Sequence, residues 1–363
     1  MGYGSSTRTR WWRQHHRRFL TFYIWQDCRV APLEQSSDVL ASVYDAALFD
    51  LDGVIYIGPH AVPGVVPVVN DMAKVHGMTM TYVTNNASRS AESVAQHLRE
   101  LGLDCGAEDV VTSAQAGAAE LAKRLAPGAS VFVLGSRDLM REVELVGLTP
   151  SQDPDVEHAA VVEGYWPDMP WRMLAHGAKV LSTGVLWVAT NMDMTIPTQW
   201  GPAPGNGSMV TMLGNAIGRK PDLVAGKPEV PLMQQSIDRA RAKHPIVIGD
   251  RLDTDIWGAN NVGIDSVCVL SGVTTVRDLC EAQVHLRPTY IAWDASCLAQ
   301  SQPAVDVSSL AVICREVSWV ADGITGAGDA LDAIRVGVAA VWHNRASTDQ
   351  VCDTLAARGI AVG

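Results

Sequence analysis

Two aspartates, Asp50 and Asp52, stand one residue apart where the apolar stretch ALF gives way to a glycine. Residues two apart in an extended strand point to the same side, so the two carboxylates would share one site. Carboxylates paired in this way can attack an electrophile, exchange protons or bind a hard cation such as magnesium. Which of these roles applies depends on the groups that the rest of the chain brings to them.

Short apolar runs that end in polar residues alternate with helical stretches from about residue 45. The runs are AALFD, TMTYVTNN, PIVIGD and DSVCVLSG. The stretch SAESVAQHLRELG among them opens with Ser90, which is suited to N-capping a helix, and closes with Gly102, which is suited to ending one. This alternation predicts an α/β fold with a Rossmann-like core, in which helices cover both faces of a parallel sheet.

Each conspicuous polar cluster follows one of the predicted strands. The clusters are DLDG at 50–53, TNN at 84–86 and GDRLDTD at 249–255. Ligands of such folds bind beyond the carboxyl ends of parallel strands. We therefore expect these three loops to converge on one crevice.

The chain is long enough for two or three domains. SVFVLG (130–135), AAVVEG (159–164) and GVLWVAT (184–190) repeat the strand pattern inside a segment too long for one crossover, which predicts an inserted α/β cap. DGITGAGDAL in the last part is interpreted as the start of a helix. The first expected part is a basic tail at 1–40, which is either disordered or the result of a start site placed too far upstream. The others are a core at 41–126 and 221–299, the cap at 127–220, and a small α+β accessory unit at 303–363.

Composition excludes several classes of protein. The formal net charge of -11 argues against a general nucleic-acid binder. The seven cysteines include no CxxC pair, which favours a reduced, cytoplasmic chain without structural zinc. The apolar run FLTFYIW near the N-terminus is far shorter than the roughly 20 residues of a membrane span. We therefore expect neither nucleic acid nor a membrane as a partner.

A phosphate monoester placed against Asp50 would be repelled unless a cation neutralised its charge. Magnesium suits this task because it takes oxygen ligands, and Asp50 and Asp250 at two strand ends could each supply a carboxylate. Asp50 would then act as the nucleophile. Asp52 would be free to protonate the leaving alkoxide and later to take a proton from water.

Three further residues fit such a site. Thr84 could donate its hydroxyl to a phosphoryl oxygen, and Lys227 of VAGKPE could place a cation beside the nucleophile and the phosphate. Asp255 would hold that lysine or a metal-bound water.

The motifs DLDGVIYIG, VTNNASRS, AGKPE and GDRLDTDIWGANNVG occur in this order. With them the chain resembles the haloacid dehalogenase superfamily over about 45–275, and in particular the subclass IIA phosphatases with a C2-type cap. The resemblance implies that Asp52 also binds the metal through its backbone carbonyl. It also implies that Thr84 and Asn85 contact phosphate, that Lys227 clamps charge, and that Asp250 binds magnesium.

EDVVTSAQ, VATNMD and PGNGSMV resemble the actinobacterial enzymes that dephosphorylate glycerol 3-phosphate. Trp166 and Trp171 are bulkier than the side chains that the commoner cap sequences of the family that the chain resembles have there. The resemblance therefore does not assign the contacts between the cap and the substrate. Asn191 and Asp193 either cap a turn or reach the hydroxyls of a small polyol substrate.

The resulting prediction is a magnesium-dependent enzyme that hydrolyses small phosphate monoesters through an aspartyl-phosphate, with glycerol 3-phosphate giving glycerol and phosphate. The alternatives are a phosphatase of another small sugar phosphate or of phosphoglycolate, and a non-catalytic phosphate-binding regulatory module on the same scaffold. Asp52 favours an enzyme, because storage of phosphate needs no general acid. The expected partners are a small phosphorylated metabolite and, as an open question, a second copy of the chain.

Overall fold

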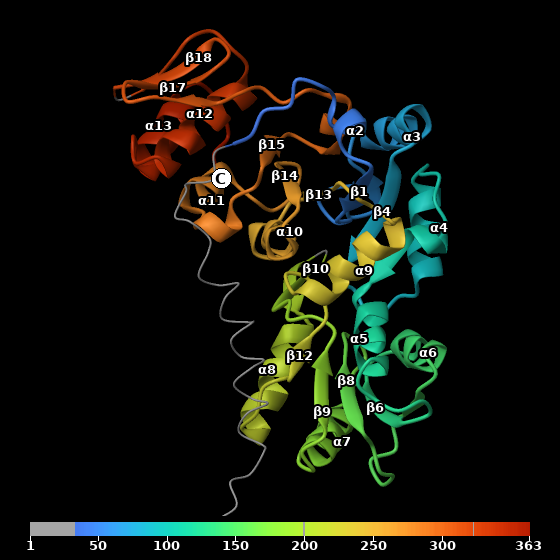
Figure 1. Cartoon of the computed structure of the whole chain (residues 1–363). Helices are drawn as coiled ribbons and strands as arrows, with labels where there is room; N and C mark the ends of the chain where they lie inside the picture. The colour runs from blue at the N-terminus through green and yellow to red at the C-terminus, as the bar shows by residue number, and fades with distance from the viewer. Residues whose placement is uncertain (1–32, 199, 322) are drawn as a thin grey trace, which may run out of the picture. The chain divides into compact units, whose positions relative to one another are not determined.

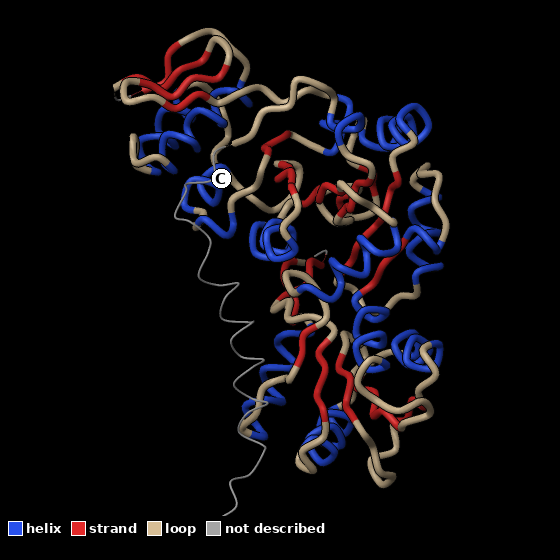
Figure 2. The backbone as a smooth tube through the Cα atoms, viewed as in Figure 1, coloured by secondary structure: helices blue, strands red, loops and turns tan. Residues whose placement is uncertain are grey.

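The computed structural model describes residues 33–198, 200–321 and 323–363 (Figures 1 and 2). Most of the predicted N-terminal tail, residues 1–32, lies outside the described residues. The backbone N–H groups of Glu34 and Ser36 donate to the carbonyls of Thr289 and Gln302, at 3.0 and 2.9 Å. The hydrogen-bonded chain therefore begins before residue 40, the boundary expected for the tail.

The first sheet has six strands and is parallel, and the parallel arrangement is the one that the alternating pattern predicts. In sheet order its strands are β15 (Tyr290–Ala292), β14 (Asp265–Val269), β13 (Pro245–Gly249), β1 (Ala46–Phe49), β4 (Thr79–Thr84) and β5 (Val110–Thr112). β1 lies between β13 and β4, so the three predicted polar clusters follow three adjacent strands. This adjacency agrees with the expectation that the three loops converge on one crevice.

Helices cover both faces of this sheet, which explains why β1 is apolar at every position. Phe49 packs in one cluster with residues of α3 (Val65–His76) and α4 (Ala91–Glu100). Leu48, one residue earlier, packs on the other face with residues of α9 (Val230–Ala240) and α10 (Trp257–Val262). The helix predicted between Ser90 and Gly102 is confirmed as α4, with the Ser90 hydroxyl accepting a hydrogen bond from the N–H of Ser93.

A second parallel sheet contains the three strands predicted for the cap and two more (Figure 2). In sheet order its strands are β12 (Leu223–Val224), β9 (Leu186–Ala189), β8 (Ala160–Glu163), β6 (Ser130–Leu134) and β7 (Thr149–Ser151). The predicted strands are β6, β8 and β9, and the added ones are β7 and β12. One face packs against α5 (Ser113–Ala122) and α6 (Arg137–Leu145), and the other against α7 (Trp171–Leu181) and α8 (Asn206–Ile217). A hairpin of β10 (Thr195–Thr198) and β11 (Gly201–Pro204) precedes α8.

The two sheets share elements at their junction. α5 precedes residue 127 yet packs on the second sheet, and β12 follows residue 220 yet pairs with β9. The cap boundaries at 127 and 220 stay a prediction.

The last part of the chain is an α+β unit with an antiparallel sheet. Its strands are β16 (Asp306–Val307), β17 (Ala311–Cys314), β18 (Val317–Val320) and β19 (Gly323–Thr325), and its helices are α12 (Ala330–Trp342) and α13 (Thr348–Ala357). Asp329 caps α12 by accepting from the N–H of Asp332 at 2.8 Å. A side chain at Gly326 would collide with the carbonyl of Glu316, so the TGAGD stretch forms a packed helix start.

Short elements complete the described chain. They are α2 (Leu40–Val43), the hairpin of β2 (Tyr56–Ile57) and β3 (His60–Ala61), α11 (Val276–Glu281), the 3-10 helices Ala107–Asp109, Val284–Leu286 and Ala295–Ala299, and a π-helical turn at Leu252–Ile256. Across residues 33–198, 200–321 and 323–363, no helix combines the length and the apolar character needed to cross a bilayer.

One carboxyl group lies inside the second sheet's apolar layer. The side chain of Glu163 is fully buried, and one of its oxygens accepts from Trp187 Nε1 at 3.1 Å. The other oxygen, Oε1, has no hydrogen-bond partner among the described residues. Burial raises the pKa of Glu163 to about 8, although the bond from Trp187 acts in the opposite direction. The group therefore keeps its proton at neutral pH.

The raised pKa predicts that Glu163 destabilises the fold as pH rises. The folded chain holds a proton that the unfolded chain releases above a pKa of 4.5, so stability is highest below that pH and falls as pH rises toward 8. We expect Glu163→Gln to raise the free energy of unfolding by roughly 2 to 4 kcal/mol at pH 9 and by little at pH 4. Urea denaturation at both pH values measures this. The exposed Glu157→Gln serves as the control, and an equal gain at both pH values would contradict the assignment.

Candidate active site

Asp50 is the first residue after β1, and its N–H donates to the carbonyl of Ile248 at 2.9 Å, which extends the strand pairing by one step. Asp52 is exposed at the turn that follows. Gly53 takes a φ of 82° and donates its N–H to the carbonyl of Tyr56 at 2.8 Å. A side chain at Gly53 would also collide with the carboxylate of Asp250. Glycine is therefore required here for conformation and for space.

Lys227 is the centre of the site. Its Nζ lies 2.5 Å from Asp50 Oδ1 and 2.7 Å from Asp255 Oδ1, and it donates to the carbonyl of Val83 at 3.3 Å. Only 4% of the side chain is exposed. Burial acts to lower the pKa of Lys227, but the charges of Asp255 and Asp50 outweigh burial and raise it above its ordinary value. The lysine is therefore a permanent cation.

Asp250 directly follows β13, and Asp255 lies in the π-helical turn Leu252–Ile256 that comes next. Asp250 Oδ2 accepts from the N–H of Val273 at 2.7 Å. Its Oδ1 is buried and has no hydrogen-bond partner within the described part of the chain. Asp255 uses one oxygen for Lys227 and accepts the N–H of Arg251 with the other, at 3.1 Å. Both carboxylate oxygens of Asp255 thus have a hydrogen-bond partner, whereas Asp250 Oδ1 is available to a ligand.

The donor set fits a magnesium ion. Asp50, Asp250 and Asp255 each offer a carboxylate oxygen, and these atoms lie within 4.8 Å of one another. Burial and the neighbouring charges of Asp50 and Asp255 raise the pKa of Asp250 to about 7. With all three carboxylates ionised, one ammonium would leave two negative charges in a buried space, and the raised pKa of Asp250 reflects that excess. An oxygen-only site with this excess suits a hard divalent cation.

The predicted metal ligands were Asp50, Asp52 and Asp250, with Asp255 in support. The structure brings the carboxylates of 50, 250 and 255 together. The side chain of Asp52 is exposed, and its expected part in metal binding was through the backbone carbonyl. The assignment of individual ligands stays a prediction.

Thr84 and Asn85 end β4 and differ in how their side chains are used. Thr84 Oγ1 accepts from the N–H of Asn86 at 3.1 Å, which leaves its hydroxyl proton for another acceptor. Asn85 accepts from the N–H of Lys227 at 2.8 Å and donates to its carbonyl at 3.0 Å. Asn85 Nδ2 also donates to Asp193 Oδ1 at 3.1 Å. These contacts favour a positioning role for Asn85 over the expected contact with phosphate.

The two predicted cap residues lie beside Asn85. Asn191 donates to the backbone carbonyl of Asn85 at 2.6 Å and accepts from the N–H of Asp193 at 3.1 Å. The first of the two alternatives for Asn191, that it caps a turn, agrees with the hydrogen bond from Asp193. Burial raises the pKa of Asp193, and the charges of Lys227 and Arg251 act against that rise. Asp193 is the one of the pair with an oxygen still available to a substrate.

The loop after β14, residues 270–275, belongs to the site but was not predicted. Its Val273 N–H holds Asp250, and Ser271 Oγ donates to the carbonyl of Gly53 at 2.6 Å. A side chain at Gly272 would collide with the carboxylate of Asp250. The sequence offered a signal, because DSVCVLSG is another strand that ends in this polar loop.

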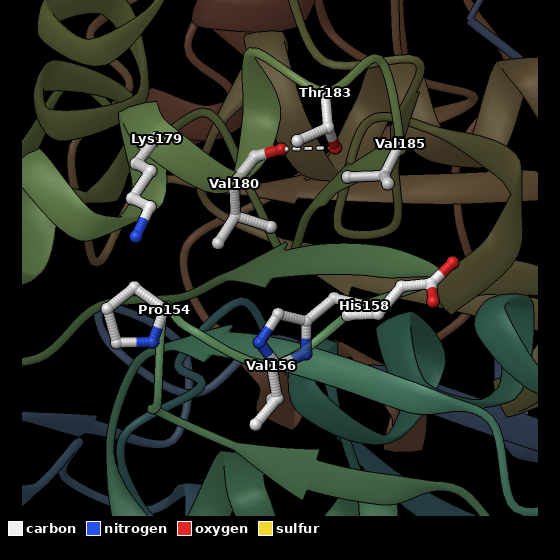
Figure 3. A pocket seen from close by; sticks show the side chains of 8 residues that line it. Pro154, Val156, His158, Lys179, Val180, Thr183 and Val185 are labelled. Atoms are coloured by element: carbon white, nitrogen blue, oxygen red, sulfur yellow. Dashed lines mark hydrogen bonds between the residues drawn. The ribbon is translucent and has the colours of Figure 1, made fainter.

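A cavity of about 380 Å³ lies elsewhere, at the amino ends of β8 and β9 (Figure 3). It contains none of the predicted site residues. His158 projects into it, but the two ring nitrogens lie 2.9 Å from Ser130 Oγ and 2.7 Å from the carbonyl of Asp153. Thr183 Oγ1 likewise donates to the carbonyl of Val180. These polar groups are used to hold the cap together.

Comparison with known families agrees with this geometry. Residues 47–149 match a family described as haloacid dehalogenase-like hydrolase, and residues 224–296 match a second, HAD-hydrolase-like family. The matched segments contain the loops of Asp50, Thr84, Lys227 and Asp250. The chain belongs to the haloacid dehalogenase-like hydrolases.

Individual relatives are phosphatases. The D-glycerol 3-phosphate phosphatase of Mycobacterium tuberculosis is 42% identical over 319 residues, which is 85% of this chain and 88% of that protein. The acid sugar phosphatase of Staphylococcus aureus is 34% identical over 249 residues, 68% of this chain and 93% of that protein. A crystal structure of the M. tuberculosis glycerol phosphate phosphatase with magnesium matches with a TM-score of 0.75 and 41% identity, and covers 84% of this chain and 92% of that one.

The packing of residues 270–275 generates a testable prediction. We expect Gly272→Ala to weaken magnesium binding at least about tenfold, because the new methyl group would displace the Asp250 carboxylate. Isothermal titration calorimetry with MgCl₂ measures this. Gly323→Ala is the matched control, since a side chain there meets open space. Equal affinity in the wild type and the Gly272 variant would remove Asp250 from the metal site.

Proposed function

We propose that this chain is a magnesium-dependent phosphatase that hydrolyses small phosphate monoesters, with glycerol 3-phosphate as its substrate and glycerol and phosphate as its products. The observation that carries the proposal is the buried cluster in which Lys227 contacts Asp50 and Asp255 while Asp250 keeps an oxygen free. The similarity to the M. tuberculosis phosphatase supports the choice of substrate.

Magnesium, when bound, would neutralise charge on the phosphate, held by the carboxylates of Asp50 and Asp250 and the backbone carbonyl of Asp52. Lys227 orients Asp50 by holding one of its carboxylate oxygens. Thr84 offers its hydroxyl proton to a phosphoryl oxygen.

In the first half-reaction, a carboxylate oxygen of Asp50 forms a bond to phosphorus while the bond from phosphorus to the glycerol oxygen breaks. Asp52 gives its proton to the departing alkoxide, so glycerol leaves as a neutral alcohol. The product on the chain is an aspartyl-phosphate at Asp50.

In the second half-reaction, Asp52 takes a proton from a water molecule, and that water attacks phosphorus. The bond between phosphorus and Asp50 breaks, inorganic phosphate leaves, and Asp52 is protonated again for the next cycle. Asp52 must move freely between the two protonation states, and its exposed position is compatible with this exchange.

Recognition of the alcohol part is assigned to Asp193. This carboxylate is held beside Lys227 through Asn85 and stands near Arg251. A carboxylate can accept hydrogen bonds from two neighbouring hydroxyls, which a glycerol group offers and a nitrophenyl group lacks.

Two further expectations also stay predictions: a second copy of the chain as a partner, and a cytoplasmic location.

The proposal is tested by phosphate release from a panel of monoesters, with and without MgCl₂. We expect glycerol 3-phosphate to rank at or near the top by kcat/KM, ahead of phosphoglycolate, sugar phosphates and p-nitrophenyl phosphate, and we expect no turnover after chelation of magnesium. A protein that binds phosphate analogues but releases no phosphate from any ester would instead be a phosphate-binding module.

Substitution of the two paired aspartates separates their roles. Asp50→Asn should abolish turnover, because the amide cannot act as the nucleophile. Asp52→Asn should lower kcat about 10²- to 10⁴-fold, which is the usual contribution of general acid-base catalysis. Asp52 serves hydrolysis of the aspartyl-phosphate with both substrates, so the acid role is tested by kcat/KM, which covers the steps up to transfer of the phosphoryl group. For Asp52→Asn, kcat/KM should fall less with p-nitrophenyl phosphate, whose leaving group needs little protonation, and an equal fall in kcat/KM with both substrates would argue against Asp52 as the acid.

The contacts of Asn85 predict a positioning effect. Asn85→Ala removes the hydrogen bonds that hold the Lys227 backbone and Asp193. We expect kcat to fall about tenfold or more with glycerol 3-phosphate and to a similar extent with p-nitrophenyl phosphate, since the lysine serves both. Asn70→Ala is the control, because Asn70 lies in α3 and its amide donates to the carbonyl of Gly102, outside the site. A loss confined to glycerol 3-phosphate would place Asn85 on the alcohol group instead.

A further inference from the structure

The loop of residues 270–275, which follows β14, holds the metal-binding side of the proposed site. Asp250 is fixed at two atoms, because its Oδ2 accepts from Val273 at 2.7 Å and its backbone carbonyl accepts from Thr274 at 3.1 Å. Ser271 ties the same loop to the carbonyl of Gly53. A shift of this loop would therefore move Asp250 relative to Asp50 and Asp52.

The loop runs directly into α11, which is only six residues long. Thr275 caps the helix by accepting from the N–H of Asp278 at 3.1 Å. An isolated helix of this length is not stable in water, so its position depends on what packs against it. The residues that pack against α11 come from α12 and α13 (Figure 1).

The C-terminal unit, residues 303–363, contacts α11 at three places. Trp342 at the end of α12 is buried, and its Nε1 donates to the carbonyl of Leu279 at 2.7 Å. The carbonyl of Val362 accepts from the N–H of Arg277 at 3.2 Å. Gly363 lies against Thr275, where an added side chain would come within 3.0 Å. The chain's last residues thus lie beside the cap of α11.

The same unit is fixed to the edge strand of the core sheet by a buried cation. Arg335 of α12 donates to the carbonyl of Ile291 in β15 at 2.9 Å and to Gln302 Oε1 at 3.0 Å. Its charge is paired with Asp332, also buried, at 2.9 Å. Breaking a buried pair of this kind is strongly unfavourable, so α12 has a fixed place against β15.

We infer that the C-terminal unit is a positioning element for the metal site: by holding α11 through Trp342 and the last two residues, it fixes the loop that orients Asp250. The inference deepens the proposed function, on which it rests for the role of Asp250 as a magnesium ligand. It assigns to residues 303–363 a measurable effect on metal affinity, beyond a contribution to folding.

Two variants test the coupling without dismantling the unit. Trp342→Phe removes the N–H that reaches Leu279 but keeps an aromatic ring for packing and for the guanidinium of Arg287, 4.8 Å from the ring centre. Deletion of Val362 and Gly363 removes the acceptor for Arg277. Arg358→Ala is the control, because its guanidinium donates to the carbonyls of Ile324 and Gly326, both of which lie within the C-terminal unit.

We expect each test variant to bind magnesium about three- to tenfold more weakly by isothermal titration calorimetry, as loss of one buried hydrogen bond predicts. The half-saturating magnesium concentration for phosphate release should rise by the same factor. The kcat at saturating magnesium should stay within about twofold of wild type, since the catalytic groups are unchanged. Arg358→Ala should match wild type in all three.

Unchanged magnesium affinity in both test variants, even with a lower melting temperature, would overturn the inference and leave the unit a stabiliser only. If Trp342→Phe fails to fold, the two-residue deletion decides alone. Binding and turnover are separate readouts. A wild type that binds magnesium but releases no phosphate refutes the proposed function, while the affinities of the variants still decide the coupling.

Discussion

The site depends on one buried ammonium group among several carboxylates. Lys227 forms an ion pair with Asp50 and another with Asp255. Its positive charge allows these two carboxylates to be ionised close to each other in a buried space. One positive charge does not balance the whole cluster, and burial together with the charges of Asp50 and Asp255 keeps the pKa of Asp250 high. The remaining imbalance is the physical basis for attracting a divalent cation.

The parallel sheet makes this crowding of charge achievable. β1 and β13 are adjacent and end at the same edge, so Asp50 and Asp250 start from backbone positions already close together. Glycines then permit close approach, since any side chain at Gly53 or Gly272 would displace the carboxylate of Asp250. The apolar layers on both faces of the sheet supply the rigidity that this arrangement needs.

Asn85 joins the nucleophile's side of the site to the second sheet. Its amide bonds to both backbone polar groups of Lys227 and to Asp193, so one side chain links the lysine's position to that of the cap. Such a link holds Asp193, which follows a strand of the second sheet, in a defined place relative to Lys227.

The sequence by itself determined the α/β class, the strands and the polar clusters that follow them, because apolar periodicity and capping residues act locally: Ser90 caps α4, and Asp50 and Asp250 each follow an apolar strand. It did not determine that Asn85 and Asn191 bond to backbone groups, that the strands before Asp50 and Asp250 are neighbours, or that residues 270–275 hold Asp250. Tertiary structure decided these, since hydrogen-bond partners 23 to 142 residues away are chosen by packing, and packing leaves no periodic pattern in the sequence.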